Sequence, residues 1–487
     1  MRHAHTVEQV RAAEAALAPA PLMERAVAGL AAACARLLTR RRGRVYGSAL
    51  LVLAGSGDSG GGALFAGARL AGRGAAVSAV LLDPGRAHPA ALAALRAAGG
   101  RVTTDQEVGL ADFSRADLIL DGIVGIGGRG GLGPAAAVYA TAPRAGLLVA
   151  VDLPSGVDAD TGEVPGAALR ADVTVTFGTY KPGLVVDPGA GHVGALHLVP
   201  IGLRPPQAPV EALQHADLAA LLPRPATESD KYRRGVVGLL AGSERYPGAA
   251  LLAVAGALRG GAGAVRYQGR PAEEVVRCHP EVLLTAGRVQ AWVVGPGSGD
   301  DTPEALDDAL ASEVPVLVDA DGLSELARRG PGALAGRAAP TLLTPHAGEA
   351  ARLLGGTVTA DQVAAARLRH ARELAARFGA TVLLKGSSTV VARPDGAVRV
   401  NPTGTSWLAT AGSGDVLAGL AGALLAAGLT PWDAAPAAAY LHGLAGRLAA
   451  GEPGAPVTAS DVAAALPAAW RDVAEGGRPG GAAGLGD

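Results

Sequence analysis

Cysteine is nearly absent: the 487 residues contain only Cys34 and Cys278, far apart and in different halves of the chain. Two such residues form neither the disulfide framework of a small secreted domain nor a cysteine cluster for a metal. Long runs of one charge are also lacking, because 43 Lys and Arg are balanced by 44 Asp and Glu. We therefore expect no nucleic-acid or anionic membrane partner, and a reducing cytoplasm fits the cysteine content.

A long uninterrupted apolar run is lacking as well. Segment 407–429 comes nearest, but it contains Asp415 and five glycines, which indicates a closely packed buried helix rather than a membrane span. The N-terminal segment carries Glu8 and Glu14 in a helical pattern, where a signal peptide would need an apolar core. We expect a chain without membrane contact.

Short apolar blocks are abundant and alternate with alanine-rich helical stretches. After two N-terminal helical segments, strands are expected at 49–55, 76–83, 118–120 and 147–154, and again at 235–243, 291–299, 314–322, 340–346 and 380–386. Strands alternating with helices predict an α/β architecture with parallel sheets. The length fits two large domains.

Prolines and polar turn residues mark the domain boundary. The segment IGLRPPQAP at 201–209 and the turn-rich stretch to residue 230 interrupt the strand pattern. We therefore predict domains at 1–203 and 231–475, with a linker at 204–230. The glycine-rich tail, 476–487, is expected to be disordered.

The first glycine loop, GSGDSG at 55–60, matches a dinucleotide-binding fingerprint. It follows an expected strand, opens a helix, and has Asp83 at the end of the next strand. A Rossmann dehydrogenase is therefore one interpretation, although the rest of the chain offers no obvious hydride-transfer site.

Two later segments follow strands where open α/β sheets bind ligands. DGIVGIGGRGGLG at 121–133 is a second glycine loop, and VDLPSGVDADTG at 151–162 puts Asp152 and Ser155 just beyond a strand. In isolation, Asp152 could equally be a turn former and Ser155 a helix cap.

Together with TVEQVRAAEAAL and PLMERA, these segments resemble the NAD(P)H-hydrate epimerase family over roughly residues 1–203. The resemblance implies a Rossmann-like α/β/α domain in which Asp152 acts at the hydrated nicotinamide nucleotide. It implies potassium ligands at Ser59, Asp121 and Ser155. Further substrate contacts are implied for Asp58, Ser59, Gly60, Gly61, Gly62, Gly125, Ile126, Gly127, Gly128, Arg129, Gly130 and Gly131.

The first loop departs from the pattern of that family, which usually reads close to G-x-G-[ND]-N-G-G-D-[GA]. Here Ser59 stands in place of the family's Asn, and Gly62 in place of its Asp. A serine hydroxyl can still coordinate potassium, whereas glycine cannot replace an acid. An impaired epimerase, or a ligand-binding or oligomerisation module without catalysis, is therefore an alternative for this half.

From Lys231 onward the chain resembles the ADP- or ATP-dependent NAD(P)H-hydrate dehydratases, which have a ribokinase-like three-layer α/β/α fold. The motifs that carry the resemblance occur in family order: HPEV (279–282), VGPGSG (294–299), VDADGLS (318–324), TPHAGE (344–349), LLKGSST (383–389) and NPTGTSWLATAGSGDVLAG (401–419). Several motifs in one order are more specific than a lone glycine loop.

The resemblance assigns residues to two ligands in this half. ADP or ATP, with magnesium, is expected at Lys385, Gly386, Ser387, Ser388, Thr389, Thr410, Gly412, Ser413 and Gly414. The hydrated nicotinamide nucleotide is expected at Ala249, Gly297, His346, Glu349 and Asp415. A homo-oligomer is also expected.

Asp415 has two compatible interpretations. Ahead of an apolar helix it can cap free N–H groups, a contribution of about 0.3 to 1 kcal/mol from the helix dipole. The resemblance implies, in addition, that Asp415 is the base for the C6 hydroxyl of the hydrated ring, beside an anion hole of glycine amides. The same GSGD loop would also serve an ordinary small-molecule kinase, which is the main alternative.

Overall fold

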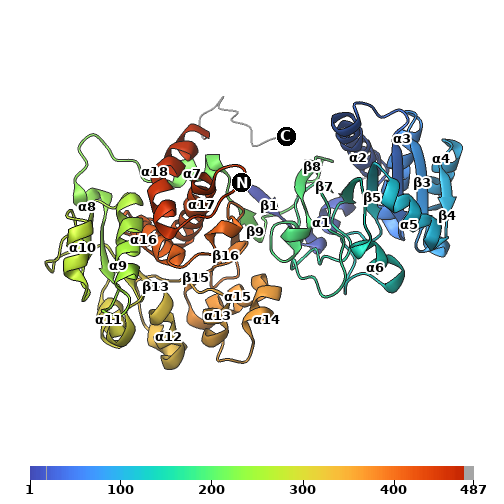
Figure 1. Cartoon of the computed structure of the whole chain (residues 1–487). Coiled ribbons are helices and arrows are strands. Elements are labelled where there is room, and N and C mark those ends of the chain that lie inside the picture. The colour runs from blue at the N-terminus through green and yellow to red at the C-terminus, as the bar shows by residue number, and fades with distance from the viewer. Residues whose placement is uncertain (18, 477–487) are drawn as a thin grey trace. The chain divides into compact units, whose positions relative to one another are not determined.

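The chain folds into two compact units, which the computed structural model describes for residues 1–17 and 19–476 (Figure 1). Of the described residues, those within 3–210 form the N-terminal domain, and 1–2 with 211–476 form the C-terminal domain. Each contains one sheet between layers of helices.

The N-terminal sheet has seven strands in the order β4-β3-β2-β5-β6-β7-β8, all parallel. Its strands are β2 (Ala49–Ala54), β3 (Ala76–Leu81), β4 (Arg101–Thr103), β5 (Leu118–Gly122), β6 (Leu147–Val151), β7 (Val173–Phe177) and β8 (Ala195–Val199). Its helices are α1 (Val7–Ala15), α2 (Pro19–Arg42), α3 (Gly57–Ala71), α4 (Pro89–Ala97), α5 (Gln106–Arg115) and α6 (Pro134–Thr141).

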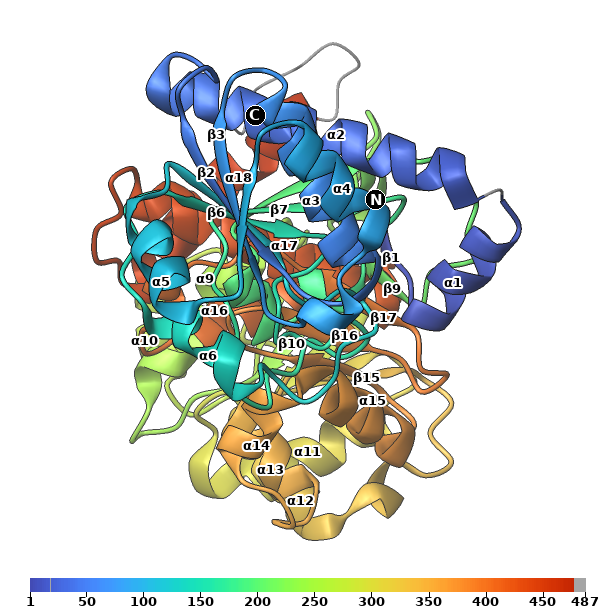
Figure 2. The same ribbon diagram turned by 90° about the vertical axis from the view of Figure 1, so that its right-hand side faces the viewer.

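Helices cover both faces of this sheet (Figure 2). On one face, α2 and α3 pack on the strands through side chains such as Leu30 and Leu64. On the other face, Phe113 of α5 and Tyr139 of α6 pack against each other and against the sheet. Because the central strands are buried on both faces, they are continuous apolar runs rather than alternating ones.

The C-terminal sheet has ten strands in the order β1-β9-β17-β16-β15-β14-β13-β12-β10-β11. The strands are β1 (Arg2–Ala4), β9 (Val210–Ala212), β10 (Val236–Leu240), β11 (Ala264–Tyr267), β12 (Ala291–Val294), β13 (Val316–Val318), β14 (Thr341–Leu343), β15 (Thr381–Leu384), β16 (Thr389–Ala392) and β17 (Val398–Asn401). The run from β11 to β15 is parallel, and β15-β16-β17 is antiparallel.

Helix α16 (Ser413–Ala426) is the centre of the C-terminal core. It is buried continuously from Val416 to Ala426 and packs closely on α9. A Cβ on Gly419 would lie 1.9 Å from the carbonyl oxygen of Ala253, and one on Gly256 would lie 2.2 Å from that of Val416. Glycine therefore lets the two helices approach closely enough to fix α16 against the sheet.

The remaining helices form the other layers of this domain (Figure 1). They are α7 (His215–Leu221), α8 (Lys231–Arg234), α9 (Pro247–Arg259), α10 (Ala272–Cys278), α11 (Thr302–Ala311), α12 (Ala320–Arg329), α13 (Ala347–Leu353), α14 (Ala360–Ala365), α15 (Arg367–Phe378), α16 (Ser413–Ala426), α17 (Pro431–Ala450) and α18 (Ala459–Gly476).

The nine expected strands are present, and the structure adds strands that the sequence did not predict, among them β7, β8 and β11. The segment expected as a linker, 204–230, instead contains β9 and α7, because Leu213 and Leu218 are buried in the C-terminal core. Of the expected tail, Gly476 ends α18, and 477–487 lie outside the described residues.

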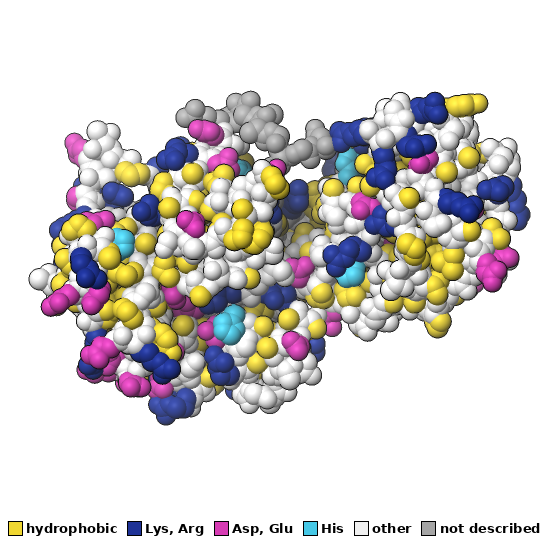
Figure 3. All heavy atoms as spheres, in the orientation of Figure 1, with side chains coloured by type: hydrophobic (Ala, Val, Ile, Leu, Met, Phe, Trp, Pro, Cys, Tyr) yellow, Lys and Arg dark blue, Asp and Glu magenta, His cyan; other side chains and the backbone are white. Residues whose placement is uncertain are grey.

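Two features of the described residues bear on the expected partners: the distribution of surface charge and the apolar character of the helices. On the face drawn in Figure 3, basic and acidic side chains are interspersed over each domain. Among the described residues, none of the helices combines the length and the apolar character that a membrane span requires.

Candidate active sites

In the C-terminal domain, Lys385 follows β15 and contacts two carboxylates, Asp319 after β13 and Glu349 in the first turn of α13. Its ammonium donates to Asp319 Oδ1 at 2.7 Å and lies 3.7 Å from Glu349 Oε2. Thr344 Oγ1 also donates to Asp319 Oδ1, at 2.9 Å. Although burial acts to lower the pKa of Lys385, the charges of Asp319 and Glu349 outweigh it and raise the pKa. The lysine that the sequence assigned to nucleotide phosphates is therefore held between two carboxylates.

The turn before α16 has the geometry of an anion site. Gly412 has a left-handed φ of 84°, and a Cβ there would lie 2.3 Å from Leu252 Cδ1, so glycine is required. The backbone N–H groups of Gly412 and Gly414 have no acceptor among the described residues. Burial lowers the pKa of His442 of α17 to about 4, against the backbone of Ser413, which acts to raise it. Two amides at a helix N-terminus are thus free to bind an anion.

Asp415 lies in the first turn of α16, beside these amides. Its carboxylate accepts no hydrogen bond from the described residues, so it does not act as a side-chain cap. Burial raises the pKa of Asp415 to about 7, and the charges of Asp319, Asp321 and Glu349 act in the same direction, against Lys385. A carboxylate that is half-ionised near neutral pH is well suited to accept a proton from a hydroxyl.

Buried Arg367, at the start of α15, fixes the loop that the sequence assigned to the nucleotide. Its guanidinium donates to the carbonyl oxygens of Lys385 at 2.6 Å, Ser388 at 3.1 Å and Leu384 at 3.4 Å. A Cβ on Gly386 would lie 1.9 Å from the Arg367 guanidinium. One side chain therefore holds three carbonyls of the loop in place.

His346 and Glu349 form a capping box at the start of α13. His346 Nδ1 accepts from the backbone N–H groups of Gly348 and Glu349, at 3.0 and 3.3 Å, and Glu349 Oε2 accepts from His346 N at 2.7 Å. Because Nδ1 is an acceptor, the neutral ring carries its proton on Nε2. Nε2 lies 3.4 Å from Glu349 Oε1, so it can present its proton to Glu349 or to a ligand, but the ring is not placed to act as a base.

The other predicted dehydratase residues lie around the same strand ends or on the loops beside them. Gly297 follows β12, and a Cβ there would lie 2.7 Å from Ala249 Cβ and 3.0 Å from Tyr246 Cβ. Exposure differs within the predicted nucleotide set: Gly386 and Ser387 are exposed, Thr410 is partly exposed, and Ser388 and Thr389 are buried.

In the N-terminal domain, Asp152 follows β6 with a left-handed φ of 72°, a strained conformation for a non-glycine residue. Its Oδ1 accepts from Lys181 Nζ, from Thr176 Oγ1 at 2.8 Å and from Phe177 N at 3.2 Å. Lys181 is 1% exposed and also donates to Thr176 Oγ1. Among the described residues only Oδ1 is occupied, which leaves Oδ2 for a ligand.

Asp121, at the end of β5, is fully buried and bonded to Ser155. Ser155 donates from Oγ to Oδ1 at 2.6 Å and from its backbone N to Oδ2 at 2.8 Å. Burial raises the pKa of Asp121 to about 6. No basic side chain of the described residues pairs with it. The third predicted ligand, Ser59, has its Oγ 2.1 Å from where a Cβ on Gly125 would lie.

Helix α1 (Val7–Ala15) lies against the second glycine loop, 121–133, at Gly127. The guanidinium of Arg11 lies 2.7 Å from where a Cβ on Gly127 would be. Glu14 shares that helix face, and burial and the charge of Asp152 raise its pKa. The predicted residues of the first loop, 58–62, begin α3, and Asp58 is exposed there.

Sequence reasoning missed several residues of these sites: Asp319, Arg367, His442, Lys181 and Glu14. Asp319 follows a strand inside the motif VDADGLS, and this position was a signal that could have been used. Glu14 lies inside TVEQVRAAEAAL, a segment that carries the family resemblance. The other three come from helices or loops distant in sequence, and no local pattern marks them.

The fold defines a protein with two α/β domains, the second of ribokinase-like type. Residues 237–468 match the family model described as NAD(P)H-hydrate dehydratase, and residues 19–183 match the YjeF-related protein N-terminus. The crystal structure of ADP/ATP-dependent NAD(P)H-hydrate dehydratase from Bacillus subtilis, co-crystallised with ATP and Mg2+, is 32% identical with a TM-score of 0.50. It covers 54% of this chain and 99% of its own.

Relatives match both halves together. The bifunctional NAD(P)H-hydrate repair enzyme of Mycobacterium leprae is 49% identical over 467 residues, covering 93% of this chain and 95% of its own length. That of Mycobacterium tuberculosis is 49% identical over 448 residues, covering 89% and 91%. That of Corynebacterium glutamicum is 37% identical over 518 residues, covering 87% and 89%. The chain belongs to the family of bifunctional NAD(P)H-hydrate repair enzymes.

Proposed function

We propose that this protein repairs hydrated NADH and NADPH. The C-terminal domain dehydrates the S epimer at the expense of ADP or ATP with magnesium, and the N-terminal domain interconverts the R and S epimers. Family membership over both halves supports this. The observation that carries the dehydratase assignment is Asp415, whose burial raises its pKa to about 7 beside two free glycine amides.

The dehydratase residues fit a reaction in which a hydroxyl is first made into a leaving group. The nucleotide with its magnesium supplies the phosphoryl group. Asp415 takes the proton of the C6 hydroxyl as that oxygen attacks phosphorus, and the amides of Gly412 and Gly414 bind the negative charge of the phosphoryl oxygens. The rest of the nucleotide departs as its bond to phosphorus breaks. Phosphate then leaves C6, and loss of a proton from C5 to solvent forms the C5=C6 double bond of the dihydropyridine ring. The carboxylates of Asp319 and Asp321 are available to complete a magnesium site with nucleotide phosphates.

Potassium fits the N-terminal site. A fully buried carboxylate without a basic partner is costly, and a monovalent cation beside Asp121 would relieve that cost. Asp121, Ser155 and Ser59 would hold the ion through oxygen atoms and fix the loop at 123–125. Asp152, oriented by Lys181, would face the hydrated ring with its second oxygen.

One assay tests both activities and the kinase alternative. A mixed R and S preparation of hydrated NADH is incubated with ATP or ADP and magnesium, and NADH is followed by its near-ultraviolet absorbance. Recovery of the whole pool faster than spontaneous epimerisation supports both domains, whereas a stop after the S portion leaves the dehydratase alone. A stable phosphorylated product without NADH would contradict the dehydratase and favour a kinase.

A gain-of-function variant separates an impaired epimerase from a domain that never epimerises. The nearest atom to a Cβ on Gly62 is Met23 Sδ at 3.9 Å, so Gly62→Asp has room for its first carbon. Faster conversion of the R epimer in this variant supports impairment of an otherwise complete site. No R conversion in either protein favours a binding or oligomerisation role.

We also propose a cytoplasmic homo-oligomer, which the family resemblance suggests. Light scattering after gel filtration measures the subunit number, and a monomeric mass at assay concentration would contradict it.

A further inference from the structure

A cavity of about 580 Å³ lies in the C-terminal domain, away from the catalytic turn. Its lining comes from the ends of α9 and α16, helix α18 and the segment at 219–234, which leads into β10. These are at the amino ends of the strands, whereas Asp415 and Lys385 lie at the carboxyl ends. The cavity is therefore separate from the site described above, and its volume is in the range of pockets for small organic ligands.

The walls of the cavity are apolar. Leu222, Leu258 and Leu424 line it together with Trp470 of α18. The indole nitrogen of Trp470 is buried and has no hydrogen-bond partner among the described residues. Because this nitrogen is inaccessible, Trp470 contributes apolar ring surface to the cavity rather than a hydrogen-bond donor.

The charged residues of the lining have one sign. Four arginines, Arg224, Arg233, Arg234 and Arg259, line the cavity, and no Asp or Glu does. None of the four forms an ion pair within the described chain: Arg233 and Arg234 donate to the backbone oxygens of Glu228 and Gly261 only. Guanidinium groups bind carboxylate and phosphate strongly, often through two parallel hydrogen bonds.

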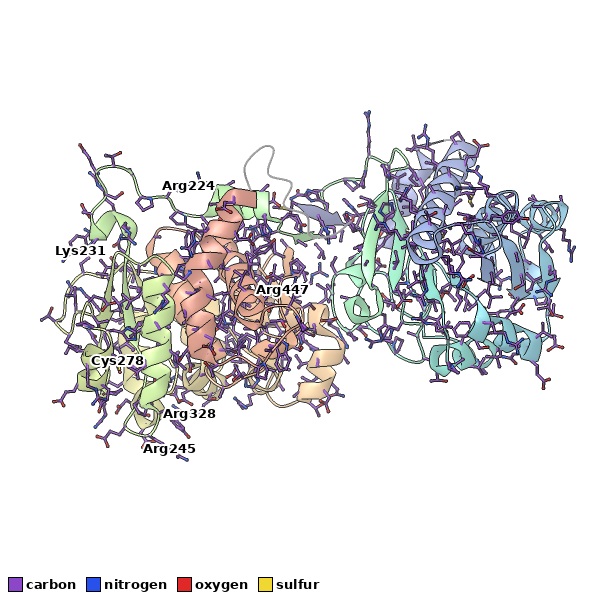
Figure 4. The ribbon with its side chains drawn as sticks, turned by 45° about the horizontal axis from the view of Figure 1, so that its top comes forward. Arg224, Lys231, Arg245, Cys278, Arg328 and Arg447 are labelled. Carbon is purple, nitrogen blue, oxygen red and sulfur yellow. The ribbon has the colours of Figure 1, made fainter. Side chains whose placement is uncertain are left out.

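We propose that this cavity binds a small amphipathic anion, in which an apolar body carries a carboxylate, sulfonate or phosphate group. The body packs between the leucines and Trp470, and the anionic group lies among the arginines of the segment at 222–234. Figure 4 shows Arg224 and Lys231 on this segment, apart from Arg245 and Arg328. Such a ligand binds together with nucleotide rather than in competition with it.

The probe is 8-anilinonaphthalene-1-sulfonate, titrated into the full-length protein and followed by its fluorescence. We expect saturation at one probe per chain, displacement by octyl phosphate and octanoate, and little displacement by octyltrimethylammonium, which has the same tail and the opposite charge. Saturating ATP with magnesium should leave the probe bound. Absence of binding, equal displacement by the cationic detergent, or displacement by ATP would each overturn the proposal.

Variants locate the probe. Arg224→Glu with Arg233→Glu reverses two exposed charges of the lining and should weaken probe binding at least tenfold. Arg277→Glu with Arg288→Glu makes the same charge change at exposed positions outside the cavity and should leave it unchanged. Equal weakening in both variants contradicts the proposal. So does a wild-type oligomer that excludes the probe until it dissociates, because a second copy would then be the occupant.

Discussion

Replacing Asp415 by Asn should abolish dehydration and at the same time stabilise the C-terminal domain. Burial and neighbouring carboxylates raise the folded-state pKa from 3.8 to about 7. The folded domain therefore binds a proton more tightly than the unfolded chain, and ionisation of Asp415 costs stability as the pH rises from about 4 to about 7. Asn removes the ionisable group and with it this cost.

The magnitude follows from the two pKa values. One pKa unit is worth about 1.4 kcal/mol, so the full cost at pH 8 is about 4 kcal/mol, and at pH 5 it is about 2 kcal/mol. The stability gained by Asp415→Asn should thus be larger at pH 8 than at pH 5 by about 2 to 3 kcal/mol. Below pH 3.8 the variant and the wild type should converge.

The assay is urea unfolding followed by tryptophan fluorescence at both pH values. The four tryptophans, at 292, 407, 432 and 470, all belong to the C-terminal domain, so the signal reports that domain. Asp308→Asn, at an exposed helix position, is the matched control and should change little. A gain in stability that is the same at pH 5 and pH 8, or a loss at pH 8, would refute the electrostatic account of Asp415.

Three further predictions concern residues that contact the sites. Lys385→Met removes the cation that opposes the rise in the pKa of Asp415, so the acid limb of the pH profile of kcat/KM should move to higher pH. An acid limb at the same pH in the variant and the wild type would contradict this. Arg367→Met leaves three loop carbonyls without their donor, so the KM for ATP should rise by about tenfold and kcat should fall by less. The exposed control, Arg377→Met, should leave the KM for ATP unchanged. Potassium should raise the melting temperature of the wild type more than sodium does, and Asp121→Asn should remove the difference; a difference that persists in the variant places the ion elsewhere.

Much of the fold could be predicted from the sequence because parallel strands buried on both faces are short apolar runs. Those at 49–54 and 291–294 were visible in this way. Strands β7 and β8 were not, because β7, VTVTF, mixes threonine with apolar residues and β8 alternates its exposure at the sheet edge. The segment at 204–230 looked like a linker because its prolines outweighed two leucines, Leu213 and Leu218, whose burial only the tertiary structure reveals.

By itself, the sequence determined the family, the order of the motifs and the turns that need glycine, because these depend on residues close together in the chain. Gly412, Ser413, Gly414 and Asp415 are of this kind. Only the tertiary structure decided the electrostatics, since Lys385 follows β15, Asp319 follows β13 and Glu349 begins α13, and the three meet at one edge of the sheet. A pKa depends on burial and on charges nearby in space, and neither is written in the local sequence around Asp415.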